Sequence, residues 1–314
     1  MPGQVLRATS ATLTAGGKGV NVVRAAQALG ASAPLVGFTA GSTGGLAAAL
    51  LAAENVTLRS VEAPGETRST TIVLAEDGTT TVLNEPGPTV NEVLWASLEQ
   101  VIAQRLDEAM SSSSEAVGHK TVMLVCSGSV PPGCPDDAYA RLVAIARDRS
   151  LPVLVDASGA LLLVALRAGP SAVTPNLAEA EAALTGAHVS GGGSATDSAA
   201  PETVQVDPAD ARERCRDAAA ELHRRGAAVA VVTGGAAGAA VATSGAVEWA
   251  PAPVVSVRNP IGAGDAFAAA YAVATIGGAA PAAAVRFAVA AASASVERDL
   301  AGALDPRRAR ELAG

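Results

Sequence analysis

The chain has 314 residues, of which 49% are hydrophobic and 17% are charged, and its formal net charge is −8. This composition supports a large buried core and argues against a disordered chain. The negative charge argues against nucleic acid or an anionic membrane surface as a partner.

The cysteines and the apolar segments favour a cytoplasmic protein. The three cysteines include no Cys-x-x-Cys pair, so neither a disulfide framework nor a zinc site is indicated. No charged segment followed by an apolar run marks a leader at the N-terminus. The apolar region 266–296 is interrupted by glycines and a proline, which favours two buried helices over a membrane span.

The N-terminal part contains a glycine cluster that opens a helix. Residues 5–14 are rich in β-type residues and predict a strand. Gly16-Gly17-Lys18-Gly19 then leads into a predicted helix over 22–29, which Gly30 ends. A glycine turn with a lysine, followed by Asn21, suits a hydroxylated anion, although a plain helix start with a solvent-exposed lysine also fits. The spacing matches neither the P-loop nor Gly-x-Gly-x-x-Gly.

A predicted hairpin follows a short strand at 35–39 and a helix at 41–53. Two β-rich runs, 67–75 and 79–83, flank Asp77-Gly78, which is a strong hairpin signal. Arg68 lies at the start of the first run, where a guanidinium group can bind a phosphate with two hydrogen bonds. Exposed arginines usually bind no phosphate, so this position alone is only a weak indication of a phosphate site.

After a helical stretch at 90–110, short apolar runs alternate with helical stretches. The runs at 121–126, 153–156, 172–174 and 228–233 predict a parallel sheet covered on both faces. Ligands of such sheets bind at the carboxyl ends of the strands. Polar groups follow all four runs, and we therefore expect them to line one crevice. They are Ser127-Gly128-Ser129, Asp156, Asn176 and Thr233-Gly234-Gly235. The Gly- and Ser-rich segment 186–210 is predicted to be a flexible surface insertion.

The stretch 259–265 predicts a glycine turn that opens a helix. Backbone N–H groups of Gly262, Ala263 and Gly264 would point out of the helix end, where the helix dipole also favours an anion. A carboxylate beside an anion is costly unless it does chemistry. Asp265 as a base that takes a hydroxyl proton explains the combination. Taken alone, an ordinary acidic helix start explains the stretch equally well.

Together these segments resemble the ribokinase-like, phosphofructokinase B (PfkB) sugar kinases. Residues 16–21 and 262–265 are similar to the two signatures of that family. Residues 127–133, 175–179 and 233–238 follow in the family's order, so the resemblance covers essentially the whole chain. Residues 66–68 and 84–88 are most similar to the branch of 1-phosphofructokinases and tagatose-6-phosphate kinases.

The resemblance implies a fold and a reaction. The fold would be one ribokinase-like domain over 1–314, a three-layer α/β sandwich around a mostly parallel sheet. A small β lid near 5–15 and 67–84 would close over the sugar and pair two subunits in a homodimer. The reaction would be Mg²⁺- and ATP-dependent phosphorylation of fructose 1-phosphate to fructose 1,6-bisphosphate. Tagatose 6-phosphate and fructose 6-phosphate are the alternative acceptors.

The resemblance also implies a role for each site residue. Asp265 would be the general base, with an anion hole formed by Gly262, Ala263 and Gly264. The sugar phosphate would be held by Gly17, Lys18, Asn21, Arg68 and Ser129. ATP would be bound by Asn176, Thr233, Gly235 and Gly238. Mg²⁺ would be positioned by Asn176 and Glu179, largely through water. Phosphoryl transfer needs mostly positioning and charge stabilisation, which this set supplies.

Two departures from the family pattern bear on activity. Thr174 stands where relatives commonly have a lysine, which removes one cation near the nucleotide. Relatives also begin with a core strand that ends in a sugar-binding Asp, ahead of the equivalent of Pro2-Gly3. This chain shows neither, and we expect a coding start placed too late. Otherwise the chain would fold poorly and have weak activity, or be an inactive sugar-phosphate-binding protein, against which the intact Asp265 argues.

Overall fold

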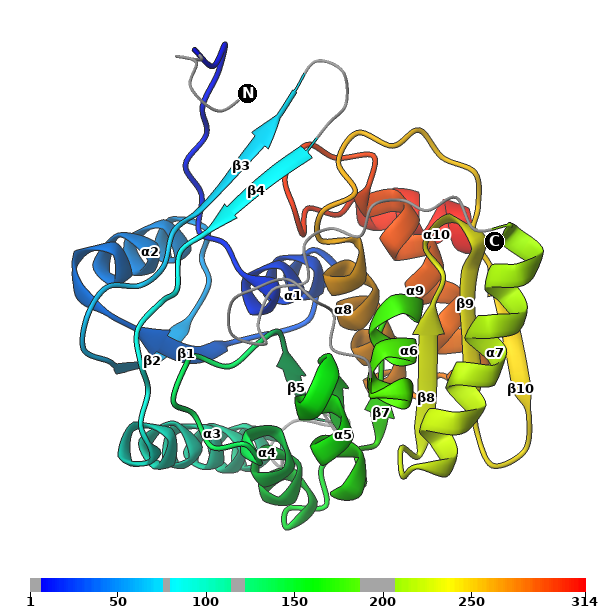
Figure 1. Cartoon of the computed structure of the whole chain (residues 1–314), viewed down its shortest axis with the longest axis horizontal. Helices are drawn as coiled ribbons and strands as arrows, with labels where there is room; N and C mark the ends of the chain where they lie inside the picture. Colours follow the sequence, from blue (N-terminus) through cyan, green and yellow to red (C-terminus); the bar gives the residue numbers. More distant parts are fainter. Residues whose placement is uncertain (1–6, 76–79, 114–121, 187–206) are drawn as a thin grey trace.

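The computed structural model describes residues 7–75, 80–113, 122–186 and 207–314. In this part of the chain, a six-stranded sheet lies between two layers of helices, and a separate two-stranded sheet and a hairpin lie to one side (Figure 1). The arrangement confirms the predicted three-layer α/β sandwich.

The central sheet is parallel over four strands and antiparallel at one edge. Its order is β10-β9-β8-β7-β6-β5. β5 to β8 are mutually parallel, whereas β9 pairs antiparallel with β8 and with β10. The strands are β5 (Leu124–Ser127), β6 (Val153–Asp156), β7 (Ala172–Val173), β8 (Val229–Thr233), β9 (Gly238–Ala242) and β10 (Val247–Pro251). The sequence predicted β5 to β8 and missed β9 and β10.

Side chains of the central strands alternate between two apolar cores. On β6, Val153 and Val155 pack in one core and Leu154 packs in the other. The first core contains α3 (Glu92–Ser113), α4 (Ala138–Arg147), α5 (Gly159–Arg167), α6 (Leu177–Thr185) and α7 (Pro208–Arg224). The second contains α1 (Lys18–Ala28), α8 (Ala263–Ile276), α9 (Pro281–Ser295) and α10 (Pro306–Ala313). Apolar residues on both faces of a strand require this double cover.

The C-terminal apolar region forms two helices, as predicted. α8 and α9 pack against each other, and their many alanines allow a close approach. No helix in the described residues is long and apolar enough to span a membrane.

Strand β1 does not join the central sheet. β1 (Leu35–Thr39) pairs in parallel with β2 (Leu58–Glu62), and α2 (Gly41–Ala53) connects the two strands. A small apolar cluster joins α1 to this unit through residues such as Val23 and Leu51. The sequence predicted β1 and α2 but not β2.

The predicted hairpin is present and projects from the body of the molecule (Figure 1). β3 (Thr70–Leu74) and β4 (Thr80–Asn84) are antiparallel, with Thr70 opposite Asn84. Its base is fixed to α2: the Ala40 N–H donates to Thr67 Oγ1 over 2.8 Å, and Glu66 accepts from the Thr43 N–H over 2.9 Å. The hairpin therefore leans on the helix end rather than on the central sheet.

Two sequence predictions need correction. Residues 7–14 form no strand, because no described strand pairs with their backbone, and residues 1–6 lie outside the described part. Arg24 instead holds this segment through Thr14 and the carbonyl of Ala15. Of the predicted insertion 186–210, residues 187–206 lie outside the described part. Residues 208–210 belong to α7, which Asp207 caps and Pro208 begins.

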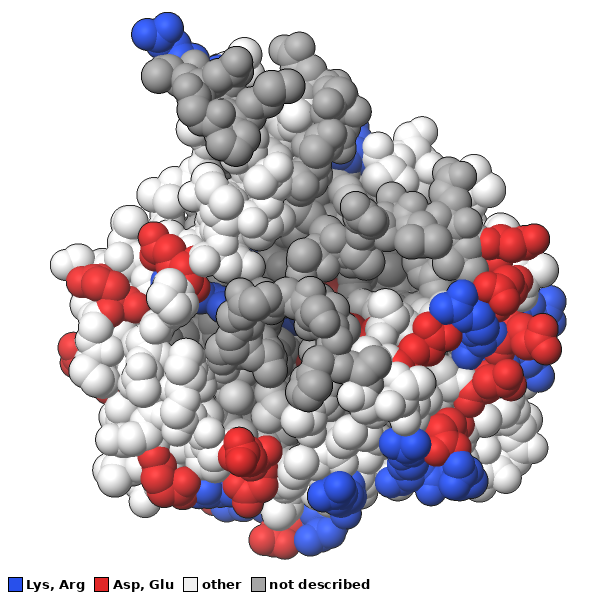
Figure 2. Space-filling view, in the orientation of Figure 1, with Lys and Arg blue, Asp and Glu red and all other residues white. Residues whose placement is uncertain are grey.

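Charged side chains of both signs are mixed on the face shown in Figure 2, notably over α7. Arg214 of α7 pairs with Glu181 at 2.7 Å and with Asp210 at 3.0 Å. Exposed pairs of this kind contribute about 0–1 kcal/mol each. The described part of this face therefore carries no extended surface of a single charge.

Candidate active site

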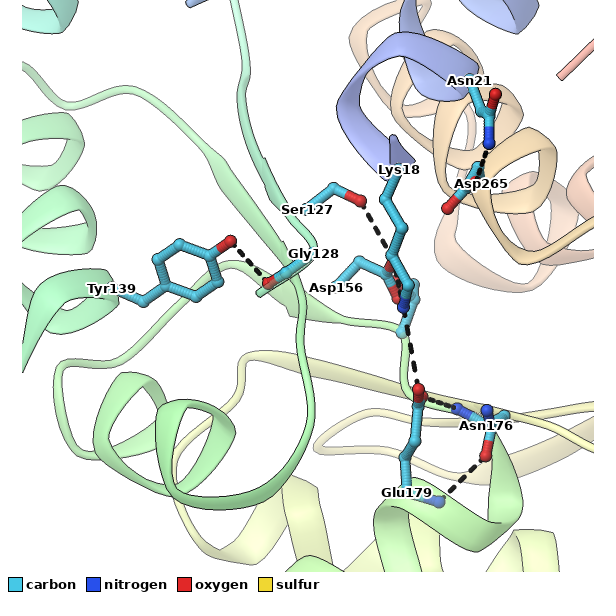
Figure 3. A network of polar contacts seen from close by, with 10 residues as sticks. Lys18, Asn21, Ser127, Gly128, Tyr139, Asp156, Asn176, Glu179 and Asp265 are labelled. Carbon is cyan, nitrogen blue, oxygen red and sulfur yellow. Dashed lines mark hydrogen bonds and ion pairs between the residues drawn. The ribbon is translucent and has the colours of Figure 1, made fainter. Parts of the chain in front are cut away.

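The strand ends predicted to line one crevice meet in a cavity of about 2230 Å³. Ser127, Asp156 and Thr233 reach it from the ends of β5, β6 and β8, and Asn176 reaches it from the start of α6. Lys18 and Asp265 reach it from the first turns of α1 and α8. Figure 3 shows the polar contacts of Lys18, Asp156 and Asn176 and, separately, the hydrogen bond between Asn21 and Asp265.

Asp265 is buried and fixed by one hydrogen bond. Asn21 Nδ2 donates to Asp265 Oδ2 over 2.7 Å, which links α1 to α8 (Figure 3). Only 5% of Asp265 is exposed. Burial and repulsion from Asp156 raise the Asp265 pKa from 3.8 to about 7, against the opposing effects of Asn21 and Lys18. A carboxylate with this pKa is a competent proton acceptor near neutral pH.

Two glycines let the loop at Gly302 pack closely between the turn before Asp265 and α1. Gly262 caps α8 in the left-handed region, with φ of 85°. A Cβ on Gly262 would lie 2.8 Å from the Gly302 nitrogen, and a Cβ on Gly302 would lie 2.6 Å from the Asn21 Cα. Both positions therefore require glycine. The sequence did not identify Gly302 as a site residue, because its spatial neighbour Asn21 lies 281 residues earlier in the chain.

Lys18 lies among three carboxylates. It is the first residue of α1, which begins four residues earlier than predicted, after Gly17 in the left-handed region. Its Nζ is 3.6 Å from Asp156 Oδ2 and 3.7 Å from Glu179 Oε1. Burial lowers the Lys18 pKa, but attraction to Asp156, Glu179 and Asp265 outweighs it and raises the pKa above its usual value. The ammonium group therefore stays charged.

Asp156 is a site residue that the sequence did not assign. It ends β6 and is 4% exposed. Ser127 Oγ donates to its Oδ2 over 3.1 Å, and Thr174 Oγ1 donates to its Oδ1 over 3.5 Å. Its place after an apolar strand was the only signal in the sequence. Its partners follow two neighbouring strands and are recognisable only in the fold.

Asn176 and Glu179 form a capping box at the start of α6. The Glu179 N–H donates to Asn176 Oδ1 over 2.9 Å, and the Asn176 N–H donates to Glu179 Oε2 over 3.0 Å. Burial, partly offset by Lys18, raises the Glu179 pKa. Because these oxygens are engaged, the pair suits a metal held through water rather than directly. The described residues contain no group of three His, Cys, Asp or Glu that could hold a metal.

The remaining predicted residues divide into two groups. Gly17, Arg68, Ser129, Gly264 and Thr233 line the cavity. Ala263, Gly235 and Gly238 do not. Gly238 begins β9, where a Cβ would collide with the backbone of β10, so this glycine also has a packing role.

The loop after β5 is anchored beside Lys18. Tyr139 OH donates to the carbonyl of Gly128 over 2.8 Å (Figure 3). Gly128 has φ of 94° and lies against the Lys18 side chain. α4 thereby fixes the backbone that carries Ser127 and Ser129.

The site thus combines a buried carboxylate, a helix start and a fixed cation. The chain matches the pfkB carbohydrate kinases over residues 2–308. The chain belongs to this family. Its members are phosphotransferases with a hydroxyl acceptor, and the chain is accordingly a sugar kinase that binds ATP and a sugar phosphate.

Individual relatives agree with this family. The chain is 34% identical to a 1-phosphofructokinase of Haloferax volcanii over 291 residues, covering 93% of the chain and 82% of the relative. It is 32% identical to ATP-dependent 6-phosphofructokinase isozyme 2 of Escherichia coli, covering 92% of the chain and 84% of the relative. The crystal structure of Escherichia coli phosphofructokinase-2 in complex with potassium superposes with a TM-score of 0.80 at 29% identity, covering 100% of this chain and 91% of the other.

Proposed function

We propose that this kinase transfers the γ-phosphoryl group of ATP to fructose 1-phosphate and yields fructose 1,6-bisphosphate. The observation that carries the proposal is the buried Asp265 in the first turn of α8, held by Asn21 and close enough to Lys18 for their charges to attract each other. The choice of acceptor is supported by the relatives named 1-phosphofructokinase, among them that of Rhodobacter capsulatus, at 31% identity over 84% of the chain and 74% of the relative. We assign residues 1–314 to a single kinase domain.

In this proposal Asp265 takes the proton of the acceptor hydroxyl as the O–P bond forms and the bond to ADP breaks. Asn21 fixes the carboxylate by binding its Oδ2, so the rotamer is set before substrate arrives. The backbone N–H groups of residues 262–264 stabilise charge on the transferred group. A separate phosphate on the sugar is held by Gly17, Lys18, Arg68 and Ser129, all of which line the cavity.

ATP lies against the ends of α6 and β8 in this proposal. Asn176 pairs with Thr233 as an isolated β-bridge, which brings the two nucleotide-side residues together. Gly235 and Gly238 shape the turn that follows Thr233. Asn176 and Glu179 would hold a Mg²⁺ ion, largely through water, and the ion would supply charge neutralisation on the phosphates. The engaged oxygens of the capping box are the reason for this indirect arrangement.

The hairpin is the candidate lid and the candidate contact between two subunits. Ile72, Val73, Leu74 and Leu83 of this hairpin are 42–63% exposed. Apolar side chains on a projecting hairpin fit a surface that a second copy covers. The three free cysteines, of which two are buried, fit a cytoplasmic location.

Fructose 6-phosphate is the second candidate acceptor. The similarity to Escherichia coli 6-phosphofructokinase isozyme 2 supports it, as does a TM-score of 0.78 to Escherichia coli phosphofructokinase-2 in complex with fructose-6-phosphate. Tagatose 6-phosphate remains the third, from sequence resemblance alone.

A coupled assay of ADP release separates these acceptors. The purified chain is given Mg-ATP with fructose 1-phosphate, fructose 6-phosphate or tagatose 6-phosphate. We expect kcat/KM for fructose 1-phosphate to exceed the other two by at least about tenfold, or about 1.4 kcal/mol in transition-state binding. Equal or higher values for fructose 6-phosphate would replace the first candidate with the second. Binding of all three without ADP release would identify a binding protein.

A further inference from the structure

The Asn21 side chain lies between a carboxylate and a guanidinium group. Its Nδ2 donates to Asp265 Oδ2 over 2.7 Å (Figure 3), and its Oδ1 accepts from Arg24 Nη1 over 3.4 Å. Asn21 is 7% exposed, and 8% of the Arg24 side chain is exposed. The Asn21 amide is therefore held from both ends by partners that are largely shielded from water.

Arg24 is fixed on its other sides. Its Nε and Nη2 donate to the two carboxylate oxygens of Glu54, with 2.6 Å between Nη2 and Oε1. Nη2 also donates to the carbonyl of Ala15 over 2.7 Å and to Thr14 Oγ1 over 2.9 Å. Because the guanidinium group is planar and rigid, these contacts set the position of the Nη1 that faces Asn21. A plain tie between α1 and α2 explains the contact with Glu54 but not the contact with Asn21.

An asparagine amide has two orientations that occupy nearly the same space. Half a turn exchanges the oxygen, which only accepts, with the NH2 group, which only donates. Beside an ionised Asp265 the NH2 group is favoured, because a carboxylate has no proton to donate. A protonated Asp265 can instead donate to the amide oxygen, which makes the opposite orientation available. Asp265 alone thus does not fix the amide near neutral pH, where its pKa of about 7 leaves both forms populated.

Arg24 removes this freedom. A guanidinium group has N–H donors and no acceptor, so it pairs only with the amide oxygen of Asn21. Turning the amide would place its NH2 group against Arg24 Nη1 and leave buried donors without acceptors, which is costly. The contact with Arg24 thereby favours the orientation that donates to Asp265, and this hydrogen bond favours the ionised carboxylate.

We propose that Arg24 is a positioning residue for the base: it holds the Asn21 amide with Nδ2 toward Asp265, so that the carboxylate keeps its orientation and its charge. The inference deepens the proposed function, because it takes Asp265 as the base. Arg24 follows Asn21 by three residues on α1, about one helical turn, so the two side chains share a face.

Other charges also act on Asp265. Burial and then Asp156 at the end of β6 raise its pKa, as does Glu179 in α6, whereas Asn21 and Lys18 of α1 lower it. Of these contributions, the hydrogen bond from Asn21 is the one that depends on the orientation of the amide. Loss of Arg24 should therefore raise the Asp265 pKa, and should do so only while Asn21 is present.

The test follows the Asp265 carboxyl group by ¹³C NMR in the full, ligand-free chain labelled at its aspartate carboxyl carbons. The Asp265 signal is the one that is missing in Asp265→Asn. Arg24→Met keeps an apolar side chain at this position and removes every donor. The matched control is Glu54→Ala, which breaks the same ion pair but leaves the contact between Arg24 and Asn21.

We expect the titration midpoint of Asp265 to rise by at least about 0.5 pH units in Arg24→Met and to stay within about 0.2 pH units of the parent in Glu54→Ala. In an Asn21→Ala background, Arg24→Met should add less than about 0.2 pH units. The acid limb of kcat should move to higher pH together with the midpoint. An unchanged midpoint in Arg24→Met, or an equal rise in Glu54→Ala or in the Asn21→Ala background, would overturn the proposal.

If Arg24→Met does not fold, Arg24→Lys decides by the same criteria. A lysine keeps a positive charge for Glu54, but its single ammonium group lacks the fork that reaches Asn21 at the same time. Asp265→Asn is assayed for ADP release alongside. Turnover that survives in Asp265→Asn would overturn the base assignment and with it the proposed function. An unchanged midpoint beside an inactive Asp265→Asn would overturn the role of Arg24 alone.

Discussion

At the scale of single residues, the charge balance of the site rests on three buried carboxylates and one lysine. Asp156, Glu179 and Asp265 are each less than one-tenth exposed, and Lys18 is the cation that offsets their charge. Asp265 keeps a pKa of about 7, raised by burial and then by Asp156. Its protonation is thus set partly by a neighbouring carboxylate, that of Asp156.

The first prediction concerns Asp156→Asn and the pH dependence of turnover. A base with a pKa near 7 is protonated below that pH, so kcat should fall on the acid side of about pH 7. Removing the negative charge of Asp156 favours the ionised form of Asp265 and should move this acid limb to lower pH. The KM for the sugar phosphate should rise, because Lys18 loses one of its anchors.

The matched control is Ser127→Ala, which removes a hydrogen bond to Asp156 but leaves its charge. This variant should keep the acid limb where it is. Steady-state values of kcat measured from pH 5.5 to 9 test this prediction. If the acid limb of the Asp156→Asn profile stays at the same pH as in the parent, Asp156 has only a structural role.

The second prediction concerns stability. The folded-state pKa of Asp265 is raised above its unfolded value, so its ionised form opposes folding once the pH exceeds the unfolded pKa near 4. Asp265→Asn should therefore raise the Tm at pH 8 by at least about 2 °C. The gain should shrink toward pH 5 and disappear near pH 4. A Tm that falls at pH 8 would contradict the proposed electrostatic cost.

Residue patterns predicted part of this site. Lys18, Asn21, Glu179 and Asp265 were identified because they belong to contiguous motifs. Asp156 was not assigned, because one polar residue after a strand is common and its partners arrive from β5 and the end of β7. Long-range proximity of this kind leaves no local spacing in the sequence.

At the scale of elements, α6 combines a structural cap with the proposed metal role. Glu179 closes the capping box and also faces Lys18. A glutamine can keep the cap but loses the charge. An alanine loses both.

The third prediction compares Glu179→Gln with Glu179→Ala. The glutamine variant should keep the Tm within about 2 °C of the parent, whereas the alanine variant should lose about 1 kcal/mol of stability from the cap. Both variants should need a higher Mg²⁺ concentration for half-maximal turnover, by at least about tenfold. Thermal scans and Mg²⁺ titrations of ADP release measure the two effects separately. A normal Mg²⁺ requirement in the glutamine variant would remove Glu179 from the metal site.

The fourth prediction concerns the exposed hairpin. Leu74 and Leu83 are 63% and 59% exposed, and both lie on the strands proposed to contact a second copy. Leu74→Lys with Leu83→Lys should convert the dimer to a monomer in sedimentation velocity. Val93→Lys is the control, because this residue is 72% exposed on α3 and outside the hairpin. A parent chain that sediments as a monomer would contradict the dimer.

Local patterns predicted some elements and missed others for physical reasons. The hairpin was predicted because Asp77-Gly78 sits between two β-rich runs. β9 was missed because Gly-Ala-Ala-Val-Ala has little β propensity and becomes a strand only through its neighbours β8 and β10. Residues 7–14 have β-type composition, but no described strand pairs with them.

At the scale of the whole molecule, apolar side chains that alternate between two cores define the sandwich. The double cover of β5 to β8 was predicted from their continuous apolar runs. The sequence did not predict that β1 and β5 lie in different sheets. The two strands are 84 residues or more apart in the chain, and pairing over such a separation depends on the other strands of the sheet.

The central claim is that Asp265 is the base of a sugar-phosphate kinase. The most direct measurement compares the parent chain with Asp265→Asn in turnover and in substrate binding, by ADP release and by calorimetry with fructose 1-phosphate. The account predicts that kcat falls by about 10²- to 10⁴-fold while the Kd for the sugar phosphate changes less than about threefold. An Asp265→Asn variant that keeps more than about one-tenth of the parent turnover would contradict it.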